Sequence, residues 1–232
     1  MITLMHPLLP SRIFLSEDEP AVLTLENPGL LAALVQDLQA QTNNEPGGFQ
    51  LLDGLKAVTF SKDVALVHSP FVLDFEQRRL MTRIQSDLNA LSMSPEHYES
   101  TAQIQTALQN YLHELEAAYT VPLQWDVEIS AANIAKAANL GIMTEGLSLP
   151  ERVLLFLQTS TALKVAKYFV FVNLRPFLSQ EQLRDMLHEV RLKKYCLLLI
   201  EGKDMPRCDA CERRLTIDDA LCEIVNDFAD FR

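Results

Sequence analysis

The sequence predicts an α/β protein whose two chain ends build one domain around a mainly parallel sheet, with a helical segment inserted between them. Residues 168–200 show a strand, a helix and a second strand, and both strands are apolar on both faces, as parallel strands covered by helices are. Further strand-like segments occupy residues 1–69. In residues 70–149 apolar side chains instead recur at helical spacing. We therefore expect a head domain from residues 1–69 and 150–232, and a helical leg domain from residues 70–149.

The head begins with a predicted strand at 21–26. Asn27, Pro28 and Gly29 then supply a cap and a proline suited to a first helical turn, which predicts a helix over 28–40. Short apolar segments after a polar loop predict three further strands, at 49–52, 57–60 and 64–67.

The inserted segment and the rest of the head follow the same patterns. Helical spacing predicts four helices, at 74–91, 95–119, 130–139 and 149–165. The strand, helix and strand after them are expected at 168–172, 179–192 and 195–200, with a last strand at 220–225. Ser179 and Gln182 have the spacing of a capping box at the start of the second of these elements.

The amino-acid composition limits the classes of function that the protein can have. The 232 residues are 48% apolar and carry a formal net charge of -11, which opposes non-specific binding to a phosphate backbone. DNA binding therefore requires basic residues gathered on one surface, or bound cations. The apolar start has no basic segment and is broken by Pro7 and Pro10, and no apolar run approaches the roughly 20 residues of a membrane span. We expect a cytoplasmic protein without a signal peptide or membrane partner.

Catalytic motifs are absent from the sequence. A phosphate-binding loop needs a glycine-rich turn ending in Gly-Lys-Ser/Thr, and Gly202-Lys203 lacks both the earlier glycine and the hydroxyl residue. The five histidines form no zinc-protease motif, and no serine nucleophile turn is present. His113 and Glu116 lie one helical turn apart and could share a metal, but a solvated helix face is the preferred interpretation.

All four cysteines lie in the last quarter of the chain, and reduced thiols are expected. Cys208 and Cys211 have the spacing of half a structural zinc site. Cys196 and Cys222 could complete it, but both occur in strand-like apolar runs where cysteine behaves as a small hydrophobic residue. We therefore do not expect zinc.

Charged side chains suggest two binding sites. Asp126 and Glu128 follow Pro122 in a stretch predicted to be extended, so both would face one side and could hold a hard cation such as calcium. Unrelated surface carboxylates are the alternative. Arg79 and Arg83 share one helix face, and three lysines occur near the ends of later helices, namely Lys136, Lys164 and Lys167. These five side chains could form a stripe facing DNA phosphates, or the arginines could pair with acidic neighbours on a solvated helix.

Several segments, taken in order, resemble one known family. They are 22–27, 66–75 with the helix after it, 167–183, 194–201 and 221–224. The sequence is similar in these segments to the type II-A CRISPR-associated adaptation protein family Csn-two, and the similarity extends over nearly the whole chain.

This resemblance implies a head related to P-loop ATPases that lacks their nucleotide machinery, a helical leg, and assembly into a homotetrameric ring. It further implies binding of linear double-stranded DNA ends by the positive inner surface of the ring, association with calcium, and a non-catalytic role in spacer acquisition for antiviral defence, beside other CRISPR adaptation proteins. The calcium site would map onto Asp126 and Glu128. The ring lining would draw on the five basic residues above, by charge and region.

Two other functions remain open at this level. The chain could be a divergent nucleotide hydrolase that uses the strand-end residues Asn173 and Glu201. It could also be a scaffold that recruits the other adaptation proteins.

Overall fold

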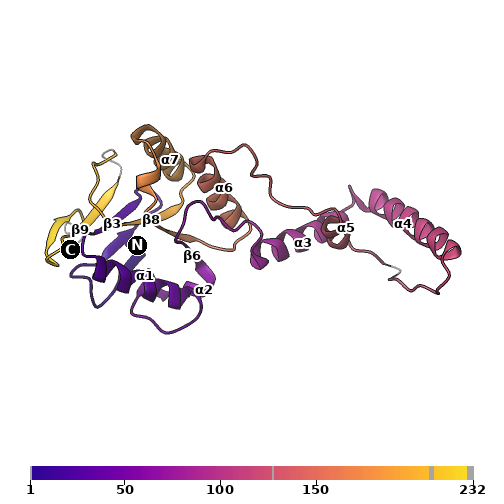
Figure 1. Cartoon of the computed structure of the whole chain (residues 1–232), viewed down its shortest axis with the longest axis horizontal. Helices are drawn as coiled ribbons and strands as arrows, with labels where there is room; N and C mark the ends of the chain where they lie inside the picture. The colour runs from indigo at the N-terminus through magenta and orange to yellow at the C-terminus, as the bar shows by residue number, and fades with distance from the viewer. Residues whose placement is uncertain (1, 127, 209–211, 229–232) are drawn as a thin grey trace. The chain divides into compact units, whose positions relative to one another are not determined.

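The computed structural model describes residues 2–126, 128–208 and 212–228. The chain forms two compact units (Figure 1). The head unit comprises Met1–Asp74 and Thr144–Arg232, and the helical unit comprises Phe75–Met143. The sequence analysis placed these boundaries at residues 69 and 150.

The head unit is built on a six-stranded sheet with the strand order β10-β9-β3-β8-β7-β6. The first five strands along the chain pair in parallel and only β10 is antiparallel to its neighbour. This arrangement confirms the predicted α/β class with a mainly parallel sheet. The strands are β3 (Ala21–Leu25), β6 (Val64–Val67), β7 (Tyr168–Val172), β8 (Cys196–Glu201), β9 (Arg213–Ile217) and β10 (Glu223–Asn226).

Helices cover both faces of this sheet (Figure 1). One face carries α6 (Leu149–Ala162) and α7 (Gln180–Leu192), and the other carries α1 (Pro28–Thr42) and the single turn α2 (Phe60–Asp63). Strand β7 is covered by helices on both faces of the sheet, and all five of its residues are buried. Phe169 packs edge-on against Phe156 of α6, whereas Tyr168 and Val170 belong to the core shared with α1.

A smaller antiparallel sheet contributes to the core on the α1 side. Its strand order is β2-β1-β4-β5, and Leu4, Leu51 and Leu34 of α1 are buried in one cluster with the large sheet. The strands are β1 (Ile2–Met5), β2 (Ile13–Leu15), β4 (Gln50–Asp53) and β5 (Lys56–Ala57).

The secondary structure corrects the sequence analysis at four places. The prediction of a strand at 57–60 is wrong. Only β5 pairs with β4 here, and the chain then forms the turn α2, where Phe60 is buried beside Phe49. Strands β1, β2 and β9 were not expected. Each is three to five residues long, and β9 begins with two arginines, so neither length nor polarity marked it as a strand.

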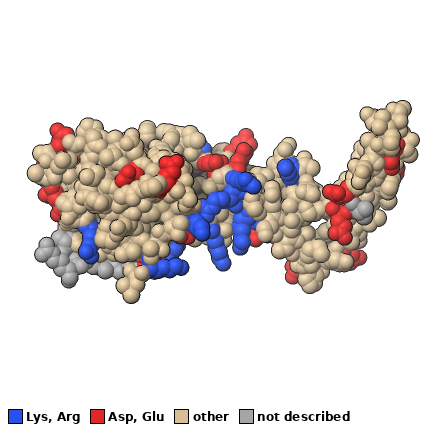
Figure 2. All heavy atoms as spheres, turned by 90° about the horizontal axis from the view of Figure 1, so that it is seen from below, with Lys and Arg blue, Asp and Glu red and all other residues tan. Residues whose placement is uncertain are grey.

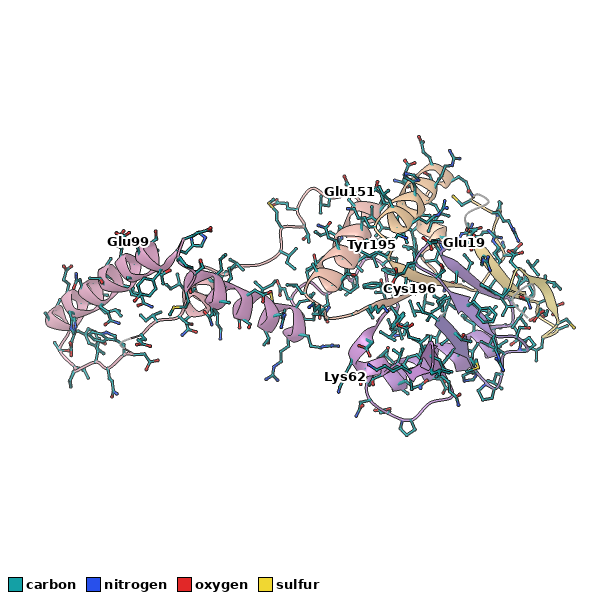
Figure 3. The ribbon with its side chains drawn as sticks, turned by 180° about the vertical axis from the view of Figure 1, so that it is seen from behind. Glu19, Lys62, Glu99, Glu151, Tyr195 and Cys196 are labelled. Carbon is teal, nitrogen blue, oxygen red and sulfur yellow. The ribbon has the colours of Figure 1, made fainter. Side chains whose placement is uncertain are left out.

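The expected helix starts are confirmed at two positions. Asn27 caps α1 by accepting a hydrogen bond from the Leu30 amide at 2.9 Å, and Pro28 occupies the first turn. Ser179 and Gln182 form the predicted capping box of α7. A further capping box joins Ser148 and Glu151 at the start of α6 (Figure 3).

The helical unit contains α3 (Arg78–Ser92), α4 (Tyr98–Ala118) and α5 (Ala131–Ala137). Helices α3 and α5 pack together, and the Asn89 side chain accepts a hydrogen bond from the Ala132 amide at 2.8 Å. The loop before α5 folds back on α4, where Trp125 donates to Gln109 at 2.7 Å. Within the described ranges, none of the helices is both long and apolar enough to span a membrane.

Candidate nucleic-acid interface

Three of the five predicted basic residues lie in the helical unit. Arg79 and Arg83 are exposed one turn apart on α3, and Lys136 is exposed in the last turn of α5. Arg83 faces Asp87 at 3.6 Å, and both side chains are about half exposed. Exposed pairs of this kind contribute only about 0.3–0.5 kcal/mol, so a phosphate could replace the carboxylate at small cost.

The other two lie in the head unit, at the end of α6 and the start of β7. Lys164 is exposed and has a positive φ of 55°, in the turn after the helix. Lys167 donates to Asp53 at 2.8 Å, and the Tyr168 hydroxyl donates to the same carboxylate at 3.0 Å. These two hydrogen bonds lower the pKa of Asp53, and the bond to Asp53 raises the pKa of Lys167. Lys167 is therefore already paired, and Lys164 is the better candidate for a phosphate.

The basic side chains visible on one face of the protein lie in several groups. On the face drawn in Figure 2, Lys and Arg form one larger group and a few smaller ones, with Asp and Glu among them. Any continuous positive surface must therefore be assembled from several groups.

The predicted calcium ligands lie in the loop between α4 and α5. Asp126 and Glu128 are both exposed, and neither belongs to a strand, so the alternation that was expected to align them is absent from the described residues. The Asp126 carbonyl already accepts a hydrogen bond from Gln109 at 3.0 Å. Calcium needs six to eight oxygen ligands, which two exposed carboxylates do not supply. Calcium stays a prediction that requires further ligands.

Other candidate metal ligands are also isolated. His113 lies 3.7 Å from Glu116, but its ring packs edge-on against Trp125. Among the described residues no three His, Cys, Asp or Glu side chains gather as a metal site would require.

The cysteines divide by burial. Cys196 and Cys208 are buried and Cys222 is exposed, while Cys211 lies outside the described residues. Burial raises the pKa of Cys196 to about 12, so this thiol at the start of β8 is an unreactive core group (Figure 3). The expectation that no zinc binds at Cys208 and Cys211 therefore stays a prediction.

The carboxyl ends of the parallel strands are where open α/β sheets usually bind ligands. The central strand β3 is joined to α1 there by only Glu26 and Asn27, and the Asn27 side chain already accepts a hydrogen bond from the Leu30 amide in the first turn of the helix. A phosphate-binding loop would need a long glycine-rich turn at such a junction. The predicted absence of that loop agrees with this geometry.

The residues considered for nucleotide hydrolysis serve the fold at the same edge. Asn173 accepts a hydrogen bond from the Gly202 amide at 2.9 Å. Glu201 is only 2% exposed and accepts one from the Arg175 amide at 3.2 Å. Burial raises the pKa of Glu201 to about 7. Because both side chains are engaged inside the protein, this geometry does not favour the hydrolase alternative.

A buried charged cluster beside this edge was missed by the sequence analysis. Arg175, Glu212 and Arg214 are each at most 4% exposed. Glu212 accepts from Arg214 Nε at 2.7 Å and lies 3.6 Å from Arg175. The two arginines also donate at 2.6 Å to the carbonyls of Pro206 and Met205 respectively, which anchors the segment after β8. The sequence offered no signal, since these residues are separated along the chain and resemble ordinary surface charges.

A comparison with protein families decides what the chain is. A family model described as CRISPR-associated protein (Cas_Csn2) matches residues 23–221. The chain belongs to this family. The resemblance found in the sequence is therefore confirmed over most of the length of this CRISPR-associated protein.

One solved structure agrees with this chain at the level of the fold. The crystal structure of Stu0660 of Streptococcus thermophilus matches 99% of this Cas_Csn2 chain and 77% of its own, with 13% identity and a TM-score of 0.58. A nucleotide-free ATP-binding cassette from an ABC transporter matches 98% of this chain and 92% of its own, at 11% identity, but its TM-score of 0.47 is too low to support an argument. No curated protein matches the chain. The relation to P-loop ATPases thus stays an implication of the resemblance.

Proposed function

We propose that this Cas_Csn2 family member is a non-catalytic ring protein that holds the ends of double-stranded DNA during type II-A CRISPR spacer acquisition. The observation that carries the proposal is the family match over residues 23–221. The short β3–α1 connection supports the non-catalytic part, because it provides no phosphate-binding loop.

The negative net charge of a single chain is the reason why the proposal includes assembly into an oligomer. A single chain has a net charge of -11, and on the face drawn in Figure 2 its basic side chains lie in several groups with acidic side chains among them. Phosphate contacts supply most of the affinity of a protein that binds DNA irrespective of sequence. Several copies placed around a duplex would turn Arg79, Arg83, Lys136 and Lys164 into a repeated lining, while the acidic groups remain elsewhere.

Helix α4 supports assembly independently of charge. None of its side chains is fully buried by the rest of the described chain. Ile104, Tyr111 and Leu115 are 53%, 56% and 44% exposed, and their spacings of seven and four residues place them on one helix face. An exposed apolar helix face of this kind marks a surface for another protein, and a homotetramer would cover it.

The proposal is tested by comparing linear with closed circular DNA of equal length in a gel-shift assay, with calcium and with chelator. We expect linear DNA to be retarded, and the retardation to weaken with chelator and with rising salt. Light scattering on the same sample should give four chains per particle. A monomer that does not retard linear DNA in calcium at low salt would contradict the proposal and would favour the scaffold alternative.

A further inference from the structure

Two phenylalanine rings are exposed together at one edge of the large sheet in the head unit. Phe71 follows β6, and Phe177 ends the short 3-10 helix η1 (Arg175–Phe177) that follows β7. Strands β6 and β7 are parallel neighbours, so both segments leave the same carboxyl edge, where open α/β sheets usually bind ligands. The ring centroids of Phe71 and Phe177 are 4.7 Å apart, and the rings cross at 75°. Phe71 is 52% exposed and Phe177 is 50% exposed, so this phenylalanine pair faces solvent.

The backbone on either side of the phenylalanine pair is ordered by local hydrogen bonds. The Val72 amide donates to the Ser69 carbonyl at 3.1 Å. The Phe177 amide donates to the Leu174 carbonyl at 3.2 Å. The neighbouring side chains of Leu73 and Leu174 are buried, which anchors both segments. The two rings are therefore held in place before anything binds, and a rigid aromatic surface loses little conformational entropy on binding.

A guanidinium group lies beside the phenylalanine pair. Arg152 is in the first turn of α6, and its Nη2 donates to the Phe71 carbonyl at 3.3 Å. Within the described part of the chain Arg152 forms no ion pair with a carboxylate. Its acidic neighbour Glu151 instead accepts hydrogen bonds from Ser148 in the capping box of α6 (Figure 3). The positive charge of Arg152 is therefore not neutralised by a carboxylate, and guanidinium groups bind phosphate well.

Aromatic rings next to a cation match the chemistry of a nucleotide. Rings stack on the flat face of a base, while the cation contacts a phosphate of the same strand. Inside a duplex both faces of every base pair are covered by the neighbouring pairs. Only the last base pair of a linear duplex exposes a face, so a surface of this kind distinguishes a DNA end from the rest of the duplex. An apolar side chain of a protein would contact the rings but would leave Arg152 without a partner.

We propose that the phenylalanine pair stacks on the terminal base pair of double-stranded DNA, with Arg152 contacting the phosphate nearest to that end. This role rests on the proposed binding of DNA ends and adds to it the residues that recognise the end itself. The basic residues considered for the lining contact phosphates all along a duplex, and they do not distinguish its last pair from the others.

Photochemical crosslinking with the full-length protein, calcium and low salt tests this contact directly. One linear duplex carries 5-iodouracil in its terminal base pair, and a second duplex of the same sequence carries it at the centre. We expect the terminal probe to crosslink to Phe71 or Phe177, identified by mass spectrometry, and the central probe to crosslink to neither. Retarded DNA without such a crosslink, or equal crosslinking from both positions, would overturn this role and leave the proposed function standing. Failure of the protein to retard linear DNA would overturn both.

Variants of the phenylalanine pair separate stacking from charge attraction. The double variant Phe71→Leu, Phe177→Leu keeps apolar side chains and removes both rings. It should bind linear DNA about tenfold more weakly, as loss of a base–aromatic stack predicts, without changing the slope of log affinity against log salt. Arg152→Gln should weaken binding and reduce that slope by about 1, because it removes a phosphate contact. Unchanged affinity of the double variant would overturn the proposal and would leave the pair as a surface for a protein.

Two controls complete the series. The double variant Phe71→Tyr, Phe177→Tyr keeps both rings and should bind linear DNA like the wild type. Leu8→Ala removes a side chain of the head unit that is 54% exposed and lies outside the phenylalanine pair, and it should also bind like the wild type. Circular dichroism checks the fold of each variant. If the double leucine variant does not fold, the single variant Phe177→Leu and the crosslinks of the wild type decide.

Discussion

Two buried glutamates, Glu201 at the end of β8 and Glu212 just before β9, should respond in opposite ways to the same substitution. Glu201 has its pKa raised from 4.5 to about 7, first by burial, with the Arg175 amide and guanidinium opposing the shift. The neutral form of Glu201 is therefore the one that the folded protein prefers. Its contribution to stability is complete below pH 4.5 and is lost as the pH rises through about 7.

The magnitude follows from the two pKa values. The difference between 4.5 and about 7 corresponds to about 3 kcal/mol at 1.36 kcal/mol per pKa unit. Glu201→Gln keeps the acceptor for the Arg175 amide and carries no charge at any pH. The difference in the free energy of unfolding, variant minus wild type, should therefore be roughly 3 kcal/mol larger at pH 8 than below pH 4.5. Most of this increase should fall between pH 5 and pH 7.

Urea unfolding at a series of pH values from 5 to 8 measures this difference. The matched control is Glu212→Gln, which removes the buried carboxylate shared by Arg175 and Arg214 and should destabilise the protein at neutral pH by about 3–5 kcal/mol. A difference between Glu201→Gln and the wild type that does not change with pH would refute the reasoning. Destabilisation of both variants alike at pH 8 would also refute it.

Three further outcomes are expected. Replacing Arg79 or Arg83 by Gln should weaken binding to linear DNA irrespective of sequence and reduce the slope of log affinity against log salt by about 1, checked by gel shift at several salt concentrations. Tyr111→Glu, on the exposed face of α4, should shift the particle mass towards the single chain in light scattering without changing the circular dichroism spectrum. Asn27→Ala should lower the free energy of unfolding by about 1 kcal/mol through loss of the α1 cap, whereas Asn27→Gly should cost only a few tenths, measured by urea unfolding.

Local patterns predicted the elements that have strong local signals. The helix α1 was marked by Asn27 and Pro28, and α7 by its capping box, because these side chains act on the backbone a few residues away. The strands β7 and β8 were visible because burial on both faces requires apolar residues at every position. Strand β9 was missed because its first two residues, Arg213 and Arg214, are charged.

The candidate site was predicted in part. The sequence showed which residues carry positive charge, and the structure places Arg79, Arg83 and Lys136 in one unit and Lys164 in the other. It could not show that Lys167 is held by Asp53, because this side-chain contact joins residues 114 positions apart in the sequence, one in β4 of the small sheet and one just before β7 of the large sheet. The roles of Asp126 and Glu128 in binding calcium stay a prediction.

Sequence alone was enough for the fold class, the family and the missing phosphate loop, since all three depend on residue order and on the spacing of apolar side chains. Tertiary structure alone revealed that Glu201 and the charged cluster of Arg175, Glu212 and Arg214 are buried. The physical reason is that burial and pairing of charges depend on contacts between distant segments. An isolated Glu or Arg in the sequence carries no mark of whether water or another charge surrounds it.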